Sequence, residues 1–199
     1  MALYGAFQKI TTGNVRTTID SSTVPVNGFP RQPLGTIYSP PITPGITTAA
    51  GQGAPPVYKY VQYNSTANPA VVAAPAPVYW KDETFTIVTG VYSEGYNSGV
   101  GAVAGYLMPN STDYSGLTAA TLNGNWVWIQ IAGFLSGAYA PTTGGAAGAT
   151  IQGSAGNWTS TAVASTTAPV TRVLAMQLTA IASSACDVLV SGYQTFWGS

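Results

Sequence analysis

Carboxylates are the first candidates for acid–base chemistry in this chain, because its 199 residues include no histidine. That absence removes the usual general base, the partner of a serine or cysteine nucleophile and the commonest zinc ligand. A glycoside hydrolase needs two carboxyl groups that flank the bond it cuts. Asp82 and Glu94 are one candidate pair, and a second pair would be Glu83 and Asp113. Isolated acids in loops are usually solvated, so we expect no catalytic site; a hydrolase built on these acids is the alternative.

Cofactor and metal motifs are also missing from the sequence. Residues 95–105 are rich in glycine but contain no lysine and lie among short strands, so they indicate turns and not a phosphate-binding loop. Asp82 and Glu83 alone do not supply the several oxygen ligands of a calcium site. Cys186 is the one cysteine and cannot form an internal disulfide; we expect a small apolar residue near a strand start. We therefore expect no metal site and no cofactor.

The chain carries unusually few charges. Only 6% of its residues are charged, against about a quarter in typical proteins, and six basic residues balance six acidic ones. Nucleic acids and anionic membranes bind clustered lysine and arginine, so we expect neither as a partner. A surface with so little charge repels other protein surfaces only weakly. The composition favours a component of an assembly over a free monomeric enzyme.

Neither a secretory leader nor a membrane-spanning helix is predicted from the sequence. Residues 1–10 contain Lys9 but no apolar core segment followed by a cleavage site, so we expect no secretory leader. The most apolar stretch, residues 69–80, contains three prolines and is too short to span a bilayer. We expect no membrane-spanning helix.

The element around which the chain is organised is predicted at residues 124–134, GNWVWIQIAGF. β-Branched and aromatic residues favour a strand over a helix here, and the side chains alternate with a period of two. One face carries Trp126, Trp128 and Gln130, and the other carries Val127, Ile129 and Ile131. We predict a central strand covered on both sides, with Gly124 and Gly133 as turn residues at its ends. The tryptophan face would meet a second sheet or a sister subunit.

Residues 1–56 are predicted to form an extended arm. Eight prolines between residues 25 and 56 restrict φ, favour extended neighbours and cannot donate to a strand ladder. Ordering about fifty residues costs on the order of 50–100 kcal/mol of backbone entropy, which this segment cannot offset by packing on itself. It must lie on its own domain, a symmetry mate or another protein, and we favour neighbours. The candidate interaction residues are Tyr4, Phe7, Arg16, Phe29, Arg31 and Tyr38.

Residues 57–199 are predicted to form one all-β domain of short antiparallel strands, either a compact β-sandwich or a β-barrel-like fold. Short strands at roughly ten-residue spacing, separated by turn signals, favour these architectures. The predicted strands are Val57–Tyr63, 77–80, 84–88, 103–108, 125–132 and 173–181, with 187–190 as the antiparallel partner of the last. Residues 140–156 are predicted as a glycine-rich hairpin or flap with weak strand character around residues 149–152.

A helix over residues 172–182 is the competing prediction for the penultimate strand, because Leu, Ala, Met and Gln are good helix formers. The segment lacks capping residues and is followed by a strand-like return, which favours a strand. Its alternation places Leu174, Met176 and Leu178 on one side, and Arg172, Gln177 and Thr179 on the other side or in solvent.

Six motifs follow one another between residues 55 and 190: YKYVQY at 58–63, APVYWKD at 76–82, TIVT at 86–89, VAG at 103–105, NWVWIQIAG at 125–133 and a closing segment at 172–182. Their order is a Pro-Val-Tyr-Trp strand, an Ala-Gly step, a Trp-Val-Trp-Ile-Gln strand, a Gly-Ala flap and a closing hairpin. This order resembles the head decoration (cement or capsid-stabilising) proteins of bacteriophages.

The resemblance implies a structural virion protein without enzymatic activity. Such a protein is made in the host cytoplasm, forms a homotrimer and binds the major capsid protein at three-fold or quasi-three-fold positions on the capsid exterior. It would clamp neighbouring capsomers against the pressure of the genome. Many proteins of this family have a short N-terminus, whereas this arm is long and rich in proline, which suggests an arm that crosses a subunit boundary. The alternative is a receptor-binding or carbohydrate-binding module of a phage tail or appendage, with exposed aromatic side chains as its platform.

Overall fold

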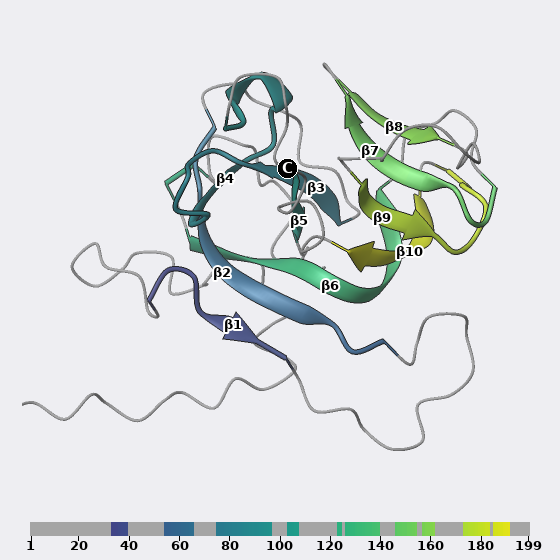
Figure 1. Cartoon of the computed structure of the whole chain (residues 1–199), viewed down its shortest axis with the longest axis horizontal. Coiled ribbons are helices and arrows are strands. Elements are labelled where there is room, and N and C mark those ends of the chain that lie inside the picture. The colour runs from purple at the N-terminus through teal and green to yellow at the C-terminus, as the bar shows by residue number, and fades with distance from the viewer. Residues whose placement is uncertain are drawn as a thin grey trace, which may run out of the picture.

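The computed structural model describes residues 33–39, 54–65, 75–96, 103–107, 123–124, 126–139, 146–154, 157–161, 173–183 and 185–191. Within these residues the chain forms one mixed sheet of ten strands and a single turn of 3-10 helix, η1 (Tyr92–Glu94), which confirms the all-β class (Figure 1). The strands are β1 (Ile37–Tyr38), β2 (Val57–Tyr63), β3 (Ala76–Trp80), β4 (Ile87–Thr89), β5 (Val103–Leu107), β6 (Trp126–Tyr139), β7 (Thr150–Ser154), β8 (Asn157–Thr161), β9 (Val173–Gln177) and β10 (Ala185–Ser191).

Five strands pair in a ring. β2 pairs with β4, β4 with β3, β3 with β5, β5 with β6, and β6 again with β2. The prediction of purely antiparallel strands is wrong at one place, because β2 and β4 run parallel. The physical reason is parity: strand direction cannot alternate all the way round a ring with an odd number of members. At least one pair must therefore run parallel, and here β2 and β4 are that pair.

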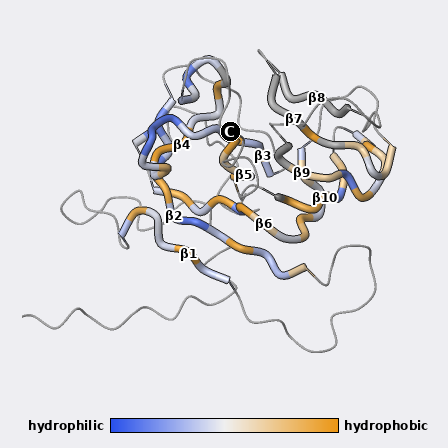
Figure 2. The backbone as a smooth tube through the Cα atoms, viewed as in Figure 1, coloured by the Kyte–Doolittle hydropathy of each residue, from blue (hydrophilic) through white to orange (hydrophobic). Residues whose placement is uncertain are grey.

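The faces of these five strands that point into the ring form a closed apolar core. Every strand of the ring contributes to it, and the residues are Val61, Tyr63, Val78, Trp80, Val88, Ala104, Leu107, Val127, Ile129 and Ile131. Hydrophobic residues accordingly run along β5 and β6, whereas the loop beside β4 is hydrophilic (Figure 2). The predicted face of Val127, Ile129 and Ile131 is thereby confirmed as core.

The second half of β6 leaves the ring and begins another layer. Residues 132–139 pair with β10, which is followed in the sheet by β9, β7 and β8. In Figure 1 this part of the sheet curls upward beside β3 and β5. A second apolar cluster fills the space between them, formed by Tyr79, Val103, Tyr106, Leu135, Ala138, Ile151, Ala175, Cys186, Val188 and Val190. A strand of 14 residues is thus shared by two layers.

The tryptophan face of β6 is covered by the chain itself. Trp128 packs with Tyr58 and Tyr60 in a third cluster, against which Leu34 and Tyr38 are placed. The ring of Trp128 lies 5.1 Å from that of Tyr60 and 6.4 Å from that of Tyr38, centroid to centroid. The prediction that both faces of this strand are covered is confirmed, but the cover is a segment from the predicted arm.

Gly133 does not end the central strand, contrary to the prediction, and β6 continues through it to Tyr139. It has φ of +88°, and a Cβ atom there would lie 2.2 Å from the carbonyl oxygen of Pro55. The chain before β2 crosses β6 at this point, and the Phe134 N–H donates to the Ala54 carbonyl at 3.1 Å. The buried amide of Gln130 donates to the carbonyl oxygens of residues 132, 133 and 134 and supports the bend. Gly124 does lie in a turn, as predicted.

The C-terminal strands were predicted correctly in type but not in orientation. β9 is a strand, and β10 returns antiparallel to it. Met176, however, is 39% exposed, while Ala175 and Gln177 are fully buried. The solvent side of β9 is therefore the Met176 side. The buried Gln177 amide is stabilised by donating to the Thr179 carbonyl at 2.9 Å.

Replacement of Gly133 by alanine is expected to lower the free energy of unfolding by about 2–5 kcal/mol. A left-handed backbone costs a residue with a side chain about 1–2 kcal/mol, and the contact with Pro55 adds overpacking of about 1–3 kcal/mol. Gly137→Ala is the matched control, since Gly137 has φ of +65° but an added methyl group would meet none of the described residues within 4 Å. Urea unfolding of both variants measures the difference. Equal losses would show that the crossing at Gly133 contributes nothing.

Tyr106→Phe is expected to stabilise the protein. The Tyr106 hydroxyl is buried and has no hydrogen-bond partner among the described residues, and burial raises the pKa of this hydroxyl well above its ordinary value. An unpaired buried polar group costs about 1–3 kcal/mol, so its removal should raise the free energy of unfolding by about 1–2 kcal/mol. The matched comparison is Gln177→Met, which removes a buried amide that is hydrogen-bonded and should destabilise. A loss of stability in Tyr106→Phe would contradict the assignment.

Candidate functional site

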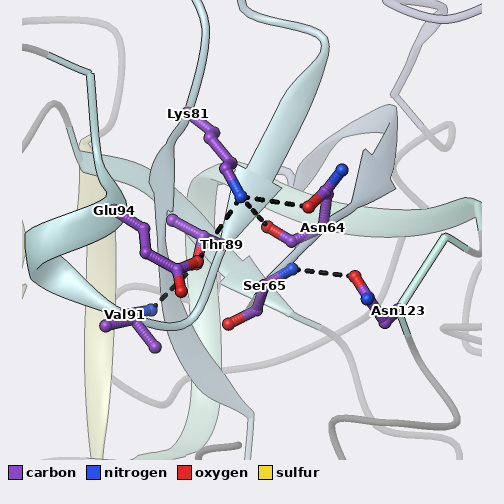
Figure 3. Close-up of polar contacts among 7 residues, drawn as sticks. All are labelled: Asn64, Ser65, Lys81, Thr89, Val91, Glu94 and Asn123. Atoms are coloured by element: carbon purple, nitrogen blue, oxygen red, sulfur yellow. Dashed lines mark hydrogen bonds and ion pairs between the residues drawn. The ribbon is translucent and has the colours of Figure 1, made fainter. Parts of the chain in front are cut away.

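A group of interacting polar side chains lies where β2, β3 and β4 end, next to η1. We call Asn64, Lys81, Thr89 and Glu94 the polar corner (Figure 3). The Lys81 Nζ atom donates to Oδ1 of Asn64 at 3.0 Å and to the Asn64 carbonyl at 3.3 Å. It also lies 3.5 Å from Oε2 of Glu94, and both side chains of this ion pair are largely shielded from solvent. Lys81 therefore joins the end of β2 to the helix η1.

Thr89 completes the polar corner. Its hydroxyl donates to Oε2 of Glu94 at 2.8 Å and accepts the Val91 N–H at 3.1 Å. The hydroxyl of Tyr63 reaches the same region: burial raises its pKa, while hydrogen bonds with the Gly90 backbone and the Ser65 side chain oppose the rise. These contacts hold the loop after β4 in one conformation.

A second set of contacts fixes the turn before β6 to the end of β2. The Ser65 N–H donates to Oδ1 of Asn123 at 2.9 Å, as Figure 3 shows. The Gly124 N–H donates to the Tyr63 carbonyl at 2.8 Å, and the Gln62 amide donates to the Gly124 carbonyl at 3.1 Å. Side chains and backbone thus set the point at which β6 enters the ring.

Asp82 organises the loop between β3 and β4. Its Oδ1 atom accepts the backbone N–H groups of Thr86 at 3.2 Å and Ile87 at 3.0 Å. Its Oδ2 atom accepts the hydroxyls of Thr84 and Thr86. Burial alone would raise the pKa of the Asp82 carboxyl, but these hydrogen bonds hold it below its ordinary value. The loop also contains Phe85, which has φ of +55°.

Lys59 was not identified from the sequence, although its spacing placed it on the same face of β2 as Val61 and Tyr63. Its register partner on β6 is Ile129, a residue of the ring core. The Nζ atom lies 4.7 Å from the centroid of the Trp80 ring, an attractive cation–π arrangement. Burial lowers the pKa of the Lys59 amine, and the nearby negative charge of Asp82 raises it. The alternation of side chains along β2 could have predicted that Lys59 lies on the core side of the strand.

In the described residues, the carboxylates of the predicted catalytic pairs are bound to other groups of the chain and not to each other. Asp82 uses both oxygens within its own loop, and Glu94 is bound to Lys81 and Thr89. Glu83 is exposed and accepts the Tyr96 hydroxyl at 3.5 Å. Asp113 lies outside the described residues. Among the residues that are described, no group of three or more His, Cys, Asp or Glu side chains could hold a metal ion.

Of the six predicted interaction residues, the structure describes Tyr38 alone. This residue lies in β1 and packs its ring on Trp128. The other five lie outside the described residues: Tyr4, Phe7, Arg16, Phe29 and Arg31. Tyr38 therefore contacts its own domain, whereas contacts with neighbours remain a prediction for the rest of the arm.

Cys186 is the second residue of β10 and is 4% exposed, which confirms its prediction as a small buried residue near a strand start. Burial raises the pKa of its thiol to about 11, and the charge of Asp187 acts in the same direction. At neutral pH the group is a thiol and not the reactive thiolate. Within the described residues, no helix is long and apolar enough to cross a membrane.

The Asp82→Asn variant is expected to lose about 1 kcal/mol of stability at neutral pH, a modest value because the group is partly exposed. Since the pKa of the folded state is lowered from 3.8, the carboxylate stabilises the fold above that pH, and this contribution disappears as pH falls through the folded-state pKa. The difference between wild type and variant should therefore shrink in acid. Chemical unfolding at several pH values from neutral to strongly acidic measures it.

Glu83→Gln is the matched control for this experiment, because it removes the neighbouring exposed carboxylate. It should change stability by less than about 0.5 kcal/mol at every pH. A difference between wild type and Asp82→Asn that stays constant with pH would contradict the role given to the Asp82 carboxylate.

Comparison of the chain with protein-family models, with curated proteins and with solved structures finds no match in any of the three. The resemblance to phage head decoration proteins therefore remains a proposal that rests on the order of its motifs.

Proposed function

We propose that this chain is a structural virion protein that binds the outer surface of a bacteriophage capsid as a homotrimer and stabilises the shell. Its scaffold would be a small barrel-like domain formed by the ring of five strands and extended by the layer that starts in β6. Residues 1–56 would act as an extended arm that contacts the major capsid protein or a neighbouring subunit.

The observation that carries this proposal is the way residues 33–39 lie on the domain. β1 adds to the edge of β2, with Ile37 opposite Lys59 and Tyr38 opposite Tyr58. Backbone hydrogen bonds extend the contact, since the Gly35 N–H donates to the Tyr60 carbonyl at 2.8 Å and the Tyr60 N–H donates to the Thr36 carbonyl at 2.9 Å. An extended, proline-flanked segment is thus bound by strand addition.

Apolar side chains of the same segment strengthen this contact. Leu34 and Tyr38 pack on the third cluster, which contains Tyr60 and Trp128. Strand addition combined with pockets for alternate side chains is a general mode of peptide recognition. The remainder of the arm contains further short apolar patches between prolines. We propose that these patches bind neighbouring protein by the same combination of backbone pairing and apolar contact.

Charge supports an assembly role in a second way. In the loops around β3 and β4, Lys81, Asp82 and Glu94 are engaged with groups of the chain itself, whereas Glu83 is exposed. Because only 6% of all residues are charged, electrostatic repulsion between protein surfaces is weak. Such a surface suits permanent contact with a shell.

The alternative, a receptor-binding or carbohydrate-binding module, needs exposed aromatic rings. Trp80 is 3% exposed and Trp128 is 5% exposed, so neither can form a platform for a sugar. Any platform would have to use other aromatic residues. The capsid-binding proposal is therefore preferred on the residues that the structure describes.

Deletion of residues 1–32 is expected to leave the domain folded and to abolish its retention on capsids. The domain should stay folded because residues 33–39, which cover Trp128, are kept. Binding should fail because the truncated arm can no longer reach a neighbour. Circular dichroism and thermal unfolding measure the fold, and co-sedimentation with capsids of the phage that encodes the chain measures binding.

The matched control is Met176→Ser, which removes an exposed apolar side chain on β9 and should leave capsid binding unchanged. Full-length protein should sediment as a trimer, and particles that carry it should withstand higher temperature and lower salt than particles without it. The proposal fails if the chain is a stable monomer and both kinds of particle are equally resistant.

A further inference from the structure

The sheet has two edge strands, and they differ in how well they are protected against pairing with a further strand. β1 lies at one end and β8 at the other, and no described strand pairs with the outer edge of either (Figure 1). An edge strand exposes a row of unpaired backbone N–H and C=O groups, which can accept another strand. Proteins usually protect such edges with charged residues, proline, bulges or very short strands.

β1 carries two of these protections. It is two residues long, and prolines stand close to it on both sides, at positions 33, 40 and 41. Proline cannot donate a backbone hydrogen bond, so a further strand added here would lose its ladder within a few residues. This edge is closed to extension.

β8 carries none of them within its own five residues, NWTST. The strand contains no charged residue and no proline. Its pairing with β7 runs through five consecutive register pairs, from Ser154 opposite Asn157 to Thr150 opposite Thr161, without a bulge. β7 is uncharged as well. The outer edge of β8 is therefore a regular, uncharged ladder of backbone groups.

We propose that β8 pairs antiparallel with β8 of a second copy of this chain, so that the two sheets become continuous across a two-fold axis. An antiparallel pair of identical strands is self-complementary, which is the geometry of an isologous contact. The identity of the occupant follows from charge: an edge without charges meets its own copy without repulsion, and the chain has a net charge of zero. Backbone pairing depends little on particular side chains, so the identical uncharged edge of a second copy fits it.

This contact goes beyond the proposed trimer, because a two-fold axis joins copies in pairs and cannot close a group of three. It would link one trimer to the next. If the chain is instead a monomer, the same contact would give a dimer. Pairing through β8 and binding to a capsid are therefore separate properties that can be tested independently.

The test uses full-length protein and measures its mass by light scattering over a range of concentrations. Wild type should shift from its basic unit to a higher mass as concentration rises. A monomer would reach twice its mass, whereas a trimer, which carries three β8 edges, would reach twice its mass or more. Because the contact is uncharged, this shift should change little between low and high salt. Thr159→Lys places a positive charge at the centre of β8 in both copies and should weaken the pairing at least about tenfold.

Two controls separate loss of the contact from loss of the fold. Ala180→Lys adds the same charge at an exposed position outside β8 and should pair like wild type. Thr159→Glu should also fail to pair with itself, but an equimolar mixture of Thr159→Lys and Thr159→Glu should regain pairs, because opposite charges then meet. Recovery in the mixture requires both variants to be folded and β8 to contact β8.

The outcomes are distinct. A concentration-dependent increase in mass that Thr159→Lys removes and the mixture restores supports the proposal. An increase that persists unchanged in Thr159→Lys overturns it and places the contact elsewhere, and so does a loss that the mixture does not restore. A wild type whose mass stays constant with concentration also overturns it. None of these results depends on whether the basic unit is a trimer, which the mass at low concentration reports separately.

Discussion

The arrangement of the whole domain depends on the backbone hydrogen bonds of β6. Its first half pairs with β2 and β5 and closes the ring, while its second half pairs with β10 and starts the second layer. Buried backbone donors and acceptors must find partners, so both layers share one register. A slip by one residue would exchange the faces of the strand and move Ile129 from the ring core to the side of the aromatic cluster. Gly133 makes this sharing possible, because β6 bends there and the chain before β2 crosses it.

Several charged side chains of this domain stabilise the loops and bends that connect its strands. Asp82 holds the loop between β3 and β4, and the ion pair of Lys81 with Glu94 holds the loop after β4. Asp187 has the same role in the second layer, where it accepts the Ser136 hydroxyl at 2.8 Å and the Gly137 N–H at 3.1 Å. Charges engaged in loop geometry are not available for steering ligands. The binding of β1 uses other interactions, backbone pairing with β2 and apolar contacts with the aromatic cluster.

Local sequence signals predicted the features that are themselves local. The alternation in β2 and the tryptophan–isoleucine alternation in β6 are properties of neighbouring residues, and both strands were found, although β6 runs further than predicted. Three features depend on contacts between distant segments and were missed or misread. Gly133 looked like a turn because its reason, the crossing by Pro55, lies far back in the chain. Met176 looked buried by type, but β9 is oriented by its pairing with β10. The parallel pairing of β2 with β4 follows from closing a ring of five, which no single segment reveals.

The closure of the ring by β6 also has a consequence for synthesis. The strands β2 to β5 leave the ribosome before β6 begins at Trp126, and their inward faces have no closing partner until then. A nascent chain is made from its N-terminus, and pairing between segments far apart in sequence is slow to form. During that interval Val61, Val78 and Val88 belong to an incomplete ring, open to contact with other nascent chains or with chaperones. We therefore expect the yield of soluble protein to depend on how quickly translation delivers β6, in addition to the stability of the finished ring.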